Sequence, residues 1–263
     1  MVFKRLFGLK REVTPRRWSA PIGQRIYAIG DIHGRRDLLD SLLEKIESDD
    51  RDRPRSDTKL IFLGDLVDRG ADSKGVVERL MALRDVSPDV RFLMGNHEEL
   101  LILAWEGDKR ATGLFNRVGG RETLLSYGIS EQAYDEADLE QLSLLIADHI
   151  PASHIDFLRS FEDWILAGDY LFVHAGIRPG YSIEEQEPSD VRWIRKEFTQ
   201  NADDHGVMVV HGHSIVEEID VQANRIGIDT GAYATDRLTA IGIEGAETWF
   251  IQTESQIISR TTS

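Results

Sequence analysis

The sequence contains no cysteine, which removes several kinds of chemistry from consideration. Disulfide bonds, zinc sites built from thiolates and cysteine nucleophiles all require a thiol group, and its absence agrees with a cytoplasmic location. Basic residues are scarce as well, because 31 lysines and arginines face 46 acidic residues, for a formal net charge of -15. An acidic surface repels phosphate backbones, so the composition predicts no nucleic-acid partner.

Long hydrophobic runs are also absent. No stretch approaches the roughly 20 apolar residues of a membrane-spanning helix, so we expect no stable membrane insertion. Residues 1–22 are basic and mildly apolar, but charges interrupt them and no small-residue cleavage site follows. We therefore predict an N-terminal arm there and not a signal peptide. The remaining composition, 41% hydrophobic and 29% charged over 263 residues, is that of a globular protein with a sizeable core.

Hydrophobic periodicity predicts alternating strands and helices in the first hundred residues. Strand patterns at 25–30, 59–63 and 90–94 are separated by helical patterns at 36–48 and 73–85. This order is typical of a mainly parallel or mixed sheet covered by helices.

The second half of the chain contains a helical segment followed by further strands. We expect residues 99–165 to be mostly helical, with a break at Gly119-Gly120. Strand composition resumes at four places, residues 170–174, 207–212, 225–229 and 237–243. We therefore predict one catalytic domain over residues 23–250, with 99–165 as an insertion, and a C-terminal tail at 251–263.

Polar clusters follow five of the expected strands. They are Asp31-Ile32-His33, Asp65 to Arg69, Asn96-His97-Glu98, His174 and His211-Gly212-His213. Ligands gather at the carboxyl ends of strands in open α/β sheets, so the clusters predict one shared crevice. Each contains histidine, aspartate or asparagine, which suit divalent metal ions. A single cluster could be a turn or a helix cap, but five in order favour a site.

Three of these clusters resemble the signature motifs of a known enzyme family. Gly30 to Gly34, Gly64 to Gly70 and Gly95 to Glu98 are similar in order and spacing to the motifs of bacterial PPP-family serine/threonine protein phosphatases. These enzymes belong to the calcineurin-like metallophosphoesterases, and the resemblance covers roughly residues 25–245. It implies an α/β fold, with a central β-sandwich flanked by helices.

The resemblance also implies a dinuclear centre of two divalent metal ions, with manganese as the first choice and iron or zinc as alternatives. Its ligands would be Asp31, His33, Asp65, Asn96, His174 and His213. Asp65 would bridge the two ions, since neighbouring cations need a shared carboxylate. Such a pair activates a water molecule for in-line attack on phosphorus.

The resemblance assigns four further residues to catalysis. Arg69 would bind two phosphate oxygens through its planar guanidinium, and Arg195 would be the second phosphate-binding arginine. His97 would donate a proton to the leaving group, and Asp68 would orient it. Three other residues have roles that stay open: Arg192, His211 and Tyr233.

These features predict a metal-dependent phosphomonoesterase whose substrates are proteins phosphorylated on serine or threonine. The alternatives are a symmetrical diadenosine tetraphosphate hydrolase, which shares the Asp-Thr-Gly stretch at 229–231, and a metal-binding scaffold without catalysis. Two observations favour the phosphatase. Glu98 stands where dinucleotide hydrolases usually carry aspartate. The acidic chain also shows no aromatic and basic cluster for a polyphosphate beyond Arg192, Trp193 and Lys196.

Overall fold

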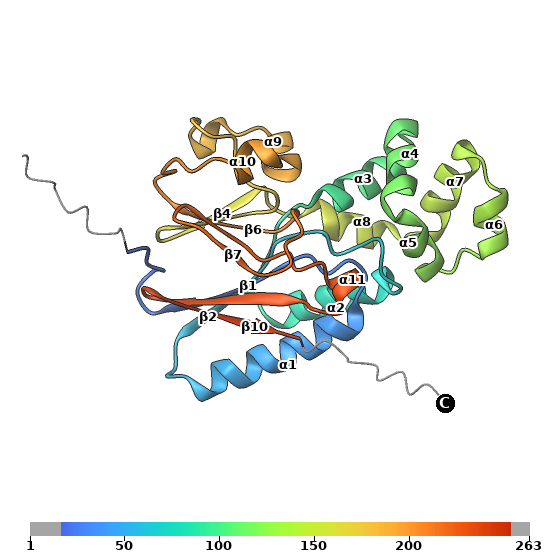
Figure 1. Ribbon diagram of the computed structural model, residues 1–263. Coiled ribbons are helices and arrows are strands. Elements are labelled where there is room, and N and C mark those ends of the chain that lie inside the picture. Colours follow the sequence, from blue (N-terminus) through green and yellow to red (C-terminus); the bar gives the residue numbers. More distant parts are fainter. Residues whose placement is uncertain (1–16, 254–263) are drawn as a thin grey trace, which may run out of the picture.

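Two stacked β-sheets form the centre of the protein in a computed structural model that describes residues 17–253. Each sheet has five strands, in the orders β10-β9-β1-β2-β3 and β4-β5-β6-β8-β7. Figure 1 shows helices on the outer sides of this sandwich. The expected α/β fold with a central β-sandwich flanked by helices is therefore confirmed. Most of the expected N-terminal arm and C-terminal tail lies outside the described residues.

The first sheet carries the βαβαβ series. Its strands are β1 (Gln24–Ile29), β2 (Asp57–Phe62), β3 (Val90–Phe92), β9 (Thr239–Glu244) and β10 (Glu247–Gln252). Strands β1, β2 and β3 are parallel, and β9 pairs with β1 in the antiparallel direction. Helices α1 (Arg36–Asp52) and α2 (Ser73–Val86) connect the parallel strands. The three parallel strands therefore all end at one edge.

The second sheet has the same arrangement at its centre. Its strands are β4 (Trp164–Ala167), β5 (Tyr170–Val173), β6 (Met208–His211), β7 (Asp220–Val221) and β8 (Arg225–Gly227). Strands β5, β6 and β8 are parallel. Four short helices lie between or after them: η1 (Ile183–Glu185), α9 (Pro188–Trp193), α10 (Lys196–Thr199) and α11 (Ala232–Thr235).

The six helices that come after β3 and before β4 in the sequence form the expected helical segment. This segment lies to one side of the sandwich (Figure 1). The helices are α3 (Asn96–Trp105), α4 (Lys109–Val118), α5 (Gly120–Ser126), α6 (Glu131–Glu136), α7 (Leu139–His149) and α8 (Ala152–Arg159). Gly119 separates α4 from α5 with a φ of 119°, a conformation that glycine adopts readily. None of the helices between residues 17 and 253 is long and apolar enough to cross a membrane.

Apolar side chains fill the space between the two sheets and the space beneath the helices. In β1, Ile26 and Ala28 belong to the layer between the sheets, whereas Tyr27 and Ile29 belong to the core under α1 and α2. Both faces of β1 are buried, which explains its nearly continuous apolar sequence.

Three strands of the structure were not predicted from the sequence. Strand β4 occupies part of the segment expected to be helical, β7 was missed, and β10 extends past residue 250 into the expected tail. All three lie at sheet edges. Strand β4 has four residues and β7 has two, so neither is long enough to show a clear periodicity in the sequence.

Candidate active site

The loops that follow the parallel strands of both sheets meet at one place. The backbone N–H of His33 donates to the carbonyl of Asp65 at 2.9 Å, which joins the ends of β1 and β2. The N–H of His213 donates to the Asp31 carboxylate at 3.0 Å, and Gly212 N–H donates to the carbonyl of His174 at 2.8 Å. The strand ends of the two sheets therefore build one site, as the sequence predicted.

Strained backbone is concentrated at this site. Between residues 17 and 253, six residues other than glycine have a positive φ. Five of them are predicted site residues: His33 (45°), Asp65 (49°), Asp68 (72°), Arg69 (68°) and His213 (61°). The sixth is Asp236. Such conformations cost about 1–3 kcal/mol each and persist only where the surrounding structure enforces them. Their grouping indicates a functional site independently of side-chain chemistry.

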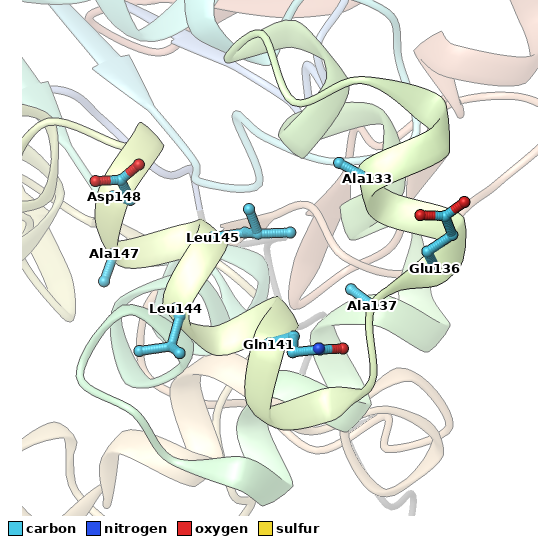
Figure 2. A pocket seen from close by; sticks show the side chains of 8 residues that line it. All are labelled: Ala133, Glu136, Ala137, Gln141, Leu144, Leu145, Ala147 and Asp148. Atoms are coloured by element: carbon cyan, nitrogen blue, oxygen red, sulfur yellow. The ribbon is translucent and has the colours of Figure 1, made fainter.

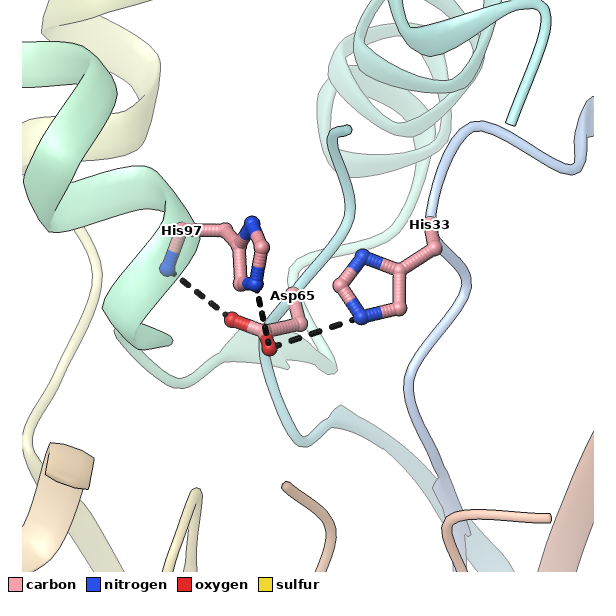
Figure 3. A group of neighbouring side chains, drawn as sticks. All are labelled: His33, Asp65 and His97. Atoms are coloured by element: carbon pink, nitrogen blue, oxygen red, sulfur yellow. Dashed lines mark hydrogen bonds and ion pairs between the residues drawn. The ribbon is translucent and has the colours of Figure 1, made fainter. Parts of the chain in front are cut away.

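The Asp65 carboxylate is the centre of the arrangement. Its Oδ2 lies 3.6 Å from His33 Nε2 and 3.8 Å from His97 Nε2, and Figure 3 shows it between these two rings. Its Oδ1 lies 3.3 Å from His174 Nε2. Two groups of potential metal ligands therefore share Asp65, one with His33 and His97, the other with His174 and His213. A shared carboxylate is what a bridge between two metal ions requires.

The charge states in this group also suit metal binding. Burial alone would raise the pKa of Asp65, but His174 and the other nearby histidines hold it well below its usual value. Burial lowers the pKa of His33 to about 3 and that of His213 to about 2. His33 and His213 are therefore neutral imidazoles beside a carboxylate, the forms that coordinate a cation, whereas the Asp65 carboxylate raises the pKa of His174 despite its burial.

Backbone hydrogen bonds hold the Nδ1 atoms of two histidines, and the Nε2 atoms of both face Asp65. Nδ1 of His33 donates to the carbonyl of Val67 at 2.8 Å, and Nδ1 of His174 donates to the carbonyl of Leu63 at 2.8 Å. The buried Nε2 of His213 has no hydrogen-bond partner. Backbone bonds of this kind fix the ring orientation of metal-bound histidines. These residues therefore fit a divalent metal ion.

The two remaining predicted ligands differ in their placement. Asn96 lies beside the second group, because its Oδ1 is 3.1 Å from His174 Nε2. Asp31 is buried at the site, but its carboxylate belongs to neither group and accepts the His213 N–H. Burial and the nearby Asp229 and Asp65 carboxylates raise the pKa of Asp31 well above its usual value.

A buried aspartate–histidine pair lies beside Asp65. Nδ1 of His97 is 2.6 Å from Oδ2 of Asp68, and the two side chains are 1% and 0% exposed. Burial opposes the charged imidazole, but Asp65 and the hydrogen bond to Asp68 outweigh it and raise the pKa of His97. This geometry is what the orienting role predicted for Asp68 needs.

The helical segment supports this pair through contacts that sequence reasoning missed. Thr123 Oγ1 on α5 donates to Asp68 Oδ1 at 2.6 Å, and Ser73 Oγ accepts the Asp68 N–H at 3.0 Å. The Arg69 N–H donates to the carbonyl of Gly119 at 3.0 Å. A Cβ at Gly119 would lie 2.7 Å from Cγ of Arg69. The sequence predicted the break at Gly119-Gly120, but it did not predict the contact of Gly119 with Arg69, which lies 50 residues earlier in the chain.

The Arg69 guanidinium spans two histidines of the site. Its Nη1 lies 2.9 Å from His33 Nε2, and its Nη2 lies 3.0 Å from His97 Nε2. It also lies over the ring of Tyr233, 4.9 Å from the centroid, and that ring meets His33 edge-on at 5.6 Å. A cation and a partly exposed aromatic ring therefore stand together at the site.

The other two arginines have different surroundings. Arg195 is exposed and approaches the site, since its Nη1 lies 3.4 Å from the carbonyl of His213. Arg192 forms ion pairs with Glu99 at 2.8 Å and with Asp163 at 2.6 Å. The geometry therefore favours Arg195 over Arg192 as a phosphate-binding residue.

His211, whose role the sequence left open, lies in the protein interior. Its ring meets Phe198 edge-on at 5.1 Å, and its Nδ1 is 3.0 Å from the carbonyl of Gly212. Burial lowers the pKa of His211 to about 4. It is therefore a neutral interior residue, outside both potential metal groups.

A groove of about 730 Å³ lies away from these residues, between α6 and α7 (Figure 2). Its lining is mainly alanine and leucine, with Glu136, Gln141 and Asp148 as the polar members. It contains neither histidine nor arginine, so it lacks the groups that phosphate chemistry requires.

A β-sandwich whose strand ends carry two histidine groups around one aspartate defines a metallophosphoesterase. The chain belongs to the calcineurin-like phosphoesterase family, whose profile matches residues 24–241. It is therefore a hydrolase of phosphoesters, and the family implies that divalent metal ions bind the site.

Three relatives with named activities are similar to this chain. The asymmetrical bis(5'-nucleosyl)-tetraphosphatase PrpE of Bacillus velezensis is 28% identical over 243 residues, covering 84% of this chain and 89% of the relative. The symmetrical bis(5'-nucleosyl)-tetraphosphatase of Delftia acidovorans is 33% identical over 160 residues, 61% of this chain and 47% of the relative. The match thus spans about half of that enzyme. Serine/threonine-protein phosphatase 2 of Escherichia coli is 30% identical over 230 residues, 82% of this chain and 91% of the relative.

A solved structure supports the fold assignment. A protein described as a candidate diadenosine tetraphosphatase superimposes with a TM-score of 0.59 at 23% identity, covering 89% of this chain and 99% of its own.

Several relatives carry the name bis(5'-nucleosyl)-tetraphosphatase, whereas the serine/threonine phosphatase is a weaker match. The expected action on phosphorylated proteins is therefore wrong, and two structural features explain the error. Glu98 accepts the backbone N–H groups of Asp65 at 2.8 Å and Leu66 at 2.7 Å, so it shapes a loop and does not report on the substrate. The search for an aromatic and basic cluster considered only neighbours in sequence, whereas Tyr233 and Arg69 form such a contact across 164 residues.

Proposed function

We propose that this protein hydrolyses dinucleoside tetraphosphates such as diadenosine tetraphosphate. The observation that carries the proposal is the Asp65 carboxylate shared by two groups of metal-binding histidines, with Arg69 and Tyr233 beside it. The shared carboxylate supports phosphate hydrolysis, and the substrate follows from the names of the relatives.

The ions would be held by the residues predicted from the sequence, Asp31, His33, Asp65, Asn96, His174 and His213. Two divalent ions, with manganese as our first choice, supply charge neutralisation at phosphate and lower the pKa of an attacking water. The backbone bonds to His33 and His174 fix the orientation of these rings, which supports their role as ligands.

The protein groups orient the substrate. Arg69 and Arg195 each donate two hydrogen bonds from the guanidinium group to phosphate oxygens. Two bonds fix the orientation of the phosphate as well as its position. Tyr233 is 36% exposed, so its ring offers a surface for a nucleobase. Stacking of a base on an aromatic ring contributes about 1–3 kcal/mol.

His97 holds a proton near the scissile bond. Asp68 keeps Nδ1 protonated, so Nε2 is the atom that faces Asp65 and the substrate. The leaving group of a dinucleoside tetraphosphate is a nucleotide phosphate, which is far less basic than the alkoxide of serine. We therefore assign His97 mainly to charge stabilisation, with proton donation secondary.

A direct substrate comparison tests the proposal. Full-length protein with MnCl₂ is given diadenosine tetraphosphate or a phosphoserine peptide, and products are separated by chromatography. We expect a kcat/KM at least tenfold higher for the dinucleotide, and loss of activity with EDTA. ADP as sole product indicates symmetrical cleavage, whereas AMP with ATP indicates asymmetrical cleavage. A higher kcat/KM for the phosphopeptide would refute the proposal.

A further inference from the structure

A buried aspartate outside the predicted ligand set lies next to the metal-binding residues. Asp229 follows β8, which is parallel to β6, so their ends lie side by side. Ile228 N–H donates to the carbonyl of His211 at 3.0 Å, and this bond holds the Asp229 loop beside the loop that carries His213. Asp229 is 2% exposed.

The second sheet approaches the first at this point. Gly30, the residue before Asp31, lies so close to Ile228 that a Cβ there would be 2.8 Å from the Ile228 carbonyl oxygen. The next residues on the two strands are Asp31 and Asp229. The two carboxylates are therefore neighbours because the two sheets touch without an intervening side chain.

The Asp229 carboxylate is only half satisfied. Its Oδ1 accepts the Gly231 N–H at 3.0 Å, but its buried Oδ2 has no hydrogen-bond partner. Within residues 17–253, neither Asp229 nor Asp31 forms an ion pair with lysine, arginine or histidine. Buried carboxylates without a counter-charge are costly unless a proton or a cation lies between them.

We propose that Asp229 is a further acidic residue of the metal centre, which acts with Asp31 on the same divalent ion. This inference rests on the metal centre that the proposed function requires, but not on the substrate. It explains why Asp31 lies apart from the group of His33 and Asp65, since Asp31 then belongs to an acidic pair. Asp229 adds one negative charge to that ion and raises the affinity of the site.

Manganese binding tests the role of Asp229 without any substrate. The full chain is stripped with EDTA, dialysed and titrated with MnCl₂, and free Mn²⁺ is measured by electron paramagnetic resonance. We expect two sites per chain in the unmodified protein. Asp229→Asn keeps an acceptor for Gly231 but removes the charge, so one site should weaken by about 10- to 100-fold while the other keeps its affinity.

Asp169→Asn is the matched control. Asp169 precedes β5, at the opposite end of the strand from His174, and accepts the Ser19 N–H at 2.9 Å. This substitution makes the same charge change and should leave both affinities unaltered. In EDTA, Asp229→Asn should unfold at the same temperature as the unmodified protein or higher, because the substitution removes a buried carboxylate that has no counter-charge.

Unaltered Mn²⁺ affinity at both sites of a folded Asp229→Asn variant would overturn the inference, since Asp229 would then only share a proton with Asp31. If Asp229→Asn does not fold, Asp229→Glu decides, because it keeps the charge but displaces it by one methylene. A site at least tenfold weaker supports the proposal, and two unaltered sites refute it. Failure to cleave diadenosine tetraphosphate would count against the proposed function alone.

Discussion

Asp68→Asn is the most informative single change at the active site. The carboxylate lies 2.6 Å from Nδ1 of His97 and has no exposed surface. Asparagine has nearly the same shape, and its amide oxygen can still accept from Thr123, so the loop should keep its structure. The substitution removes the negative charge that favours the protonated imidazole.

The size of the effect follows from the buried hydrogen bond. A hydrogen bond to a charged group contributes about 1.5–3 kcal/mol, and 1.36 kcal/mol corresponds to one pH unit. In the unmodified protein the pKa of His97 is raised, so the protonated form is present below that pKa and is lost as pH rises through it. In Asp68→Asn this loss should occur about one to two pH units lower. At a pH above both transitions, activity should fall about 10- to 100-fold.

The assay is the pH dependence of kcat/KM for diadenosine tetraphosphate. Thr123→Val is the matched control, because it removes both hydrogen bonds between Thr123 and Asp68, at 2.6 and 2.8 Å, but keeps the charge. In Thr123→Val, the pH at which activity is lost on the alkaline side should shift much less than in Asp68→Asn. If the unmodified protein, Asp68→Asn and Thr123→Val all lost activity at the same alkaline pH, the reasoning would be refuted and Asp68 would have a structural role only.

Five other substitutions address separate parts of the site. Asp65→Asn removes the shared anion, so metal analysis should show loss of bound ions and activity should fall by several orders of magnitude; two retained ions with normal turnover would contradict the bridge. His97→Ala should keep its metal content and slow alkyl phosphates by about 10²- to 10⁴-fold, with smaller losses for p-nitrophenyl phosphate and dinucleotides; equal losses on all substrates would exclude proton donation. Arg69→Ala and Arg195→Ala should each raise KM for diadenosine tetraphosphate, and an unchanged KM would remove that arginine from the phosphate site. Tyr233→Ala should raise KM for the dinucleotide by about 5- to 150-fold but leave p-nitrophenyl phosphate unaffected, whereas equal effects on both would argue against base stacking.

The strands that position the site were predictable because their sequences are simple. The second halves of strands β1 and β2 are apolar and largely buried, and a glycine followed by aspartate comes soon after each, so their ends could be located. Contacts between distant segments could not be located in this way. Thr123 reaches Asp68 across 55 residues, and Tyr233 meets Arg69 across 164, and neither pair has a local sequence pattern.

The substrate was mispredicted for a related reason. The signature motifs encode ligands for metal ions and phosphate, which every member of the family needs. Glu98 belongs to such a motif, and its bonds to the backbone of Asp65 and Leu66 show that it serves loop geometry. Whole-chain charge was equally uninformative, because Arg69 and Arg195 set the local charge where phosphate would bind.

The Asp68-Arg69 turn and the histidines at the strand ends are held by different parts of the chain. Strand-end contacts hold His174 and His213, and Glu98 at the start of α3 holds the backbone of Asp65. The Asp68-Arg69 turn instead contacts Gly119 and Thr123, farther along the helical segment. A change in the length or tilt of α4 and α5 would therefore move Arg69 while His174 and His213 stay in place. Variation in this one peripheral segment would alter how the guanidinium is presented without altering the residues at the ends of β5 and β6.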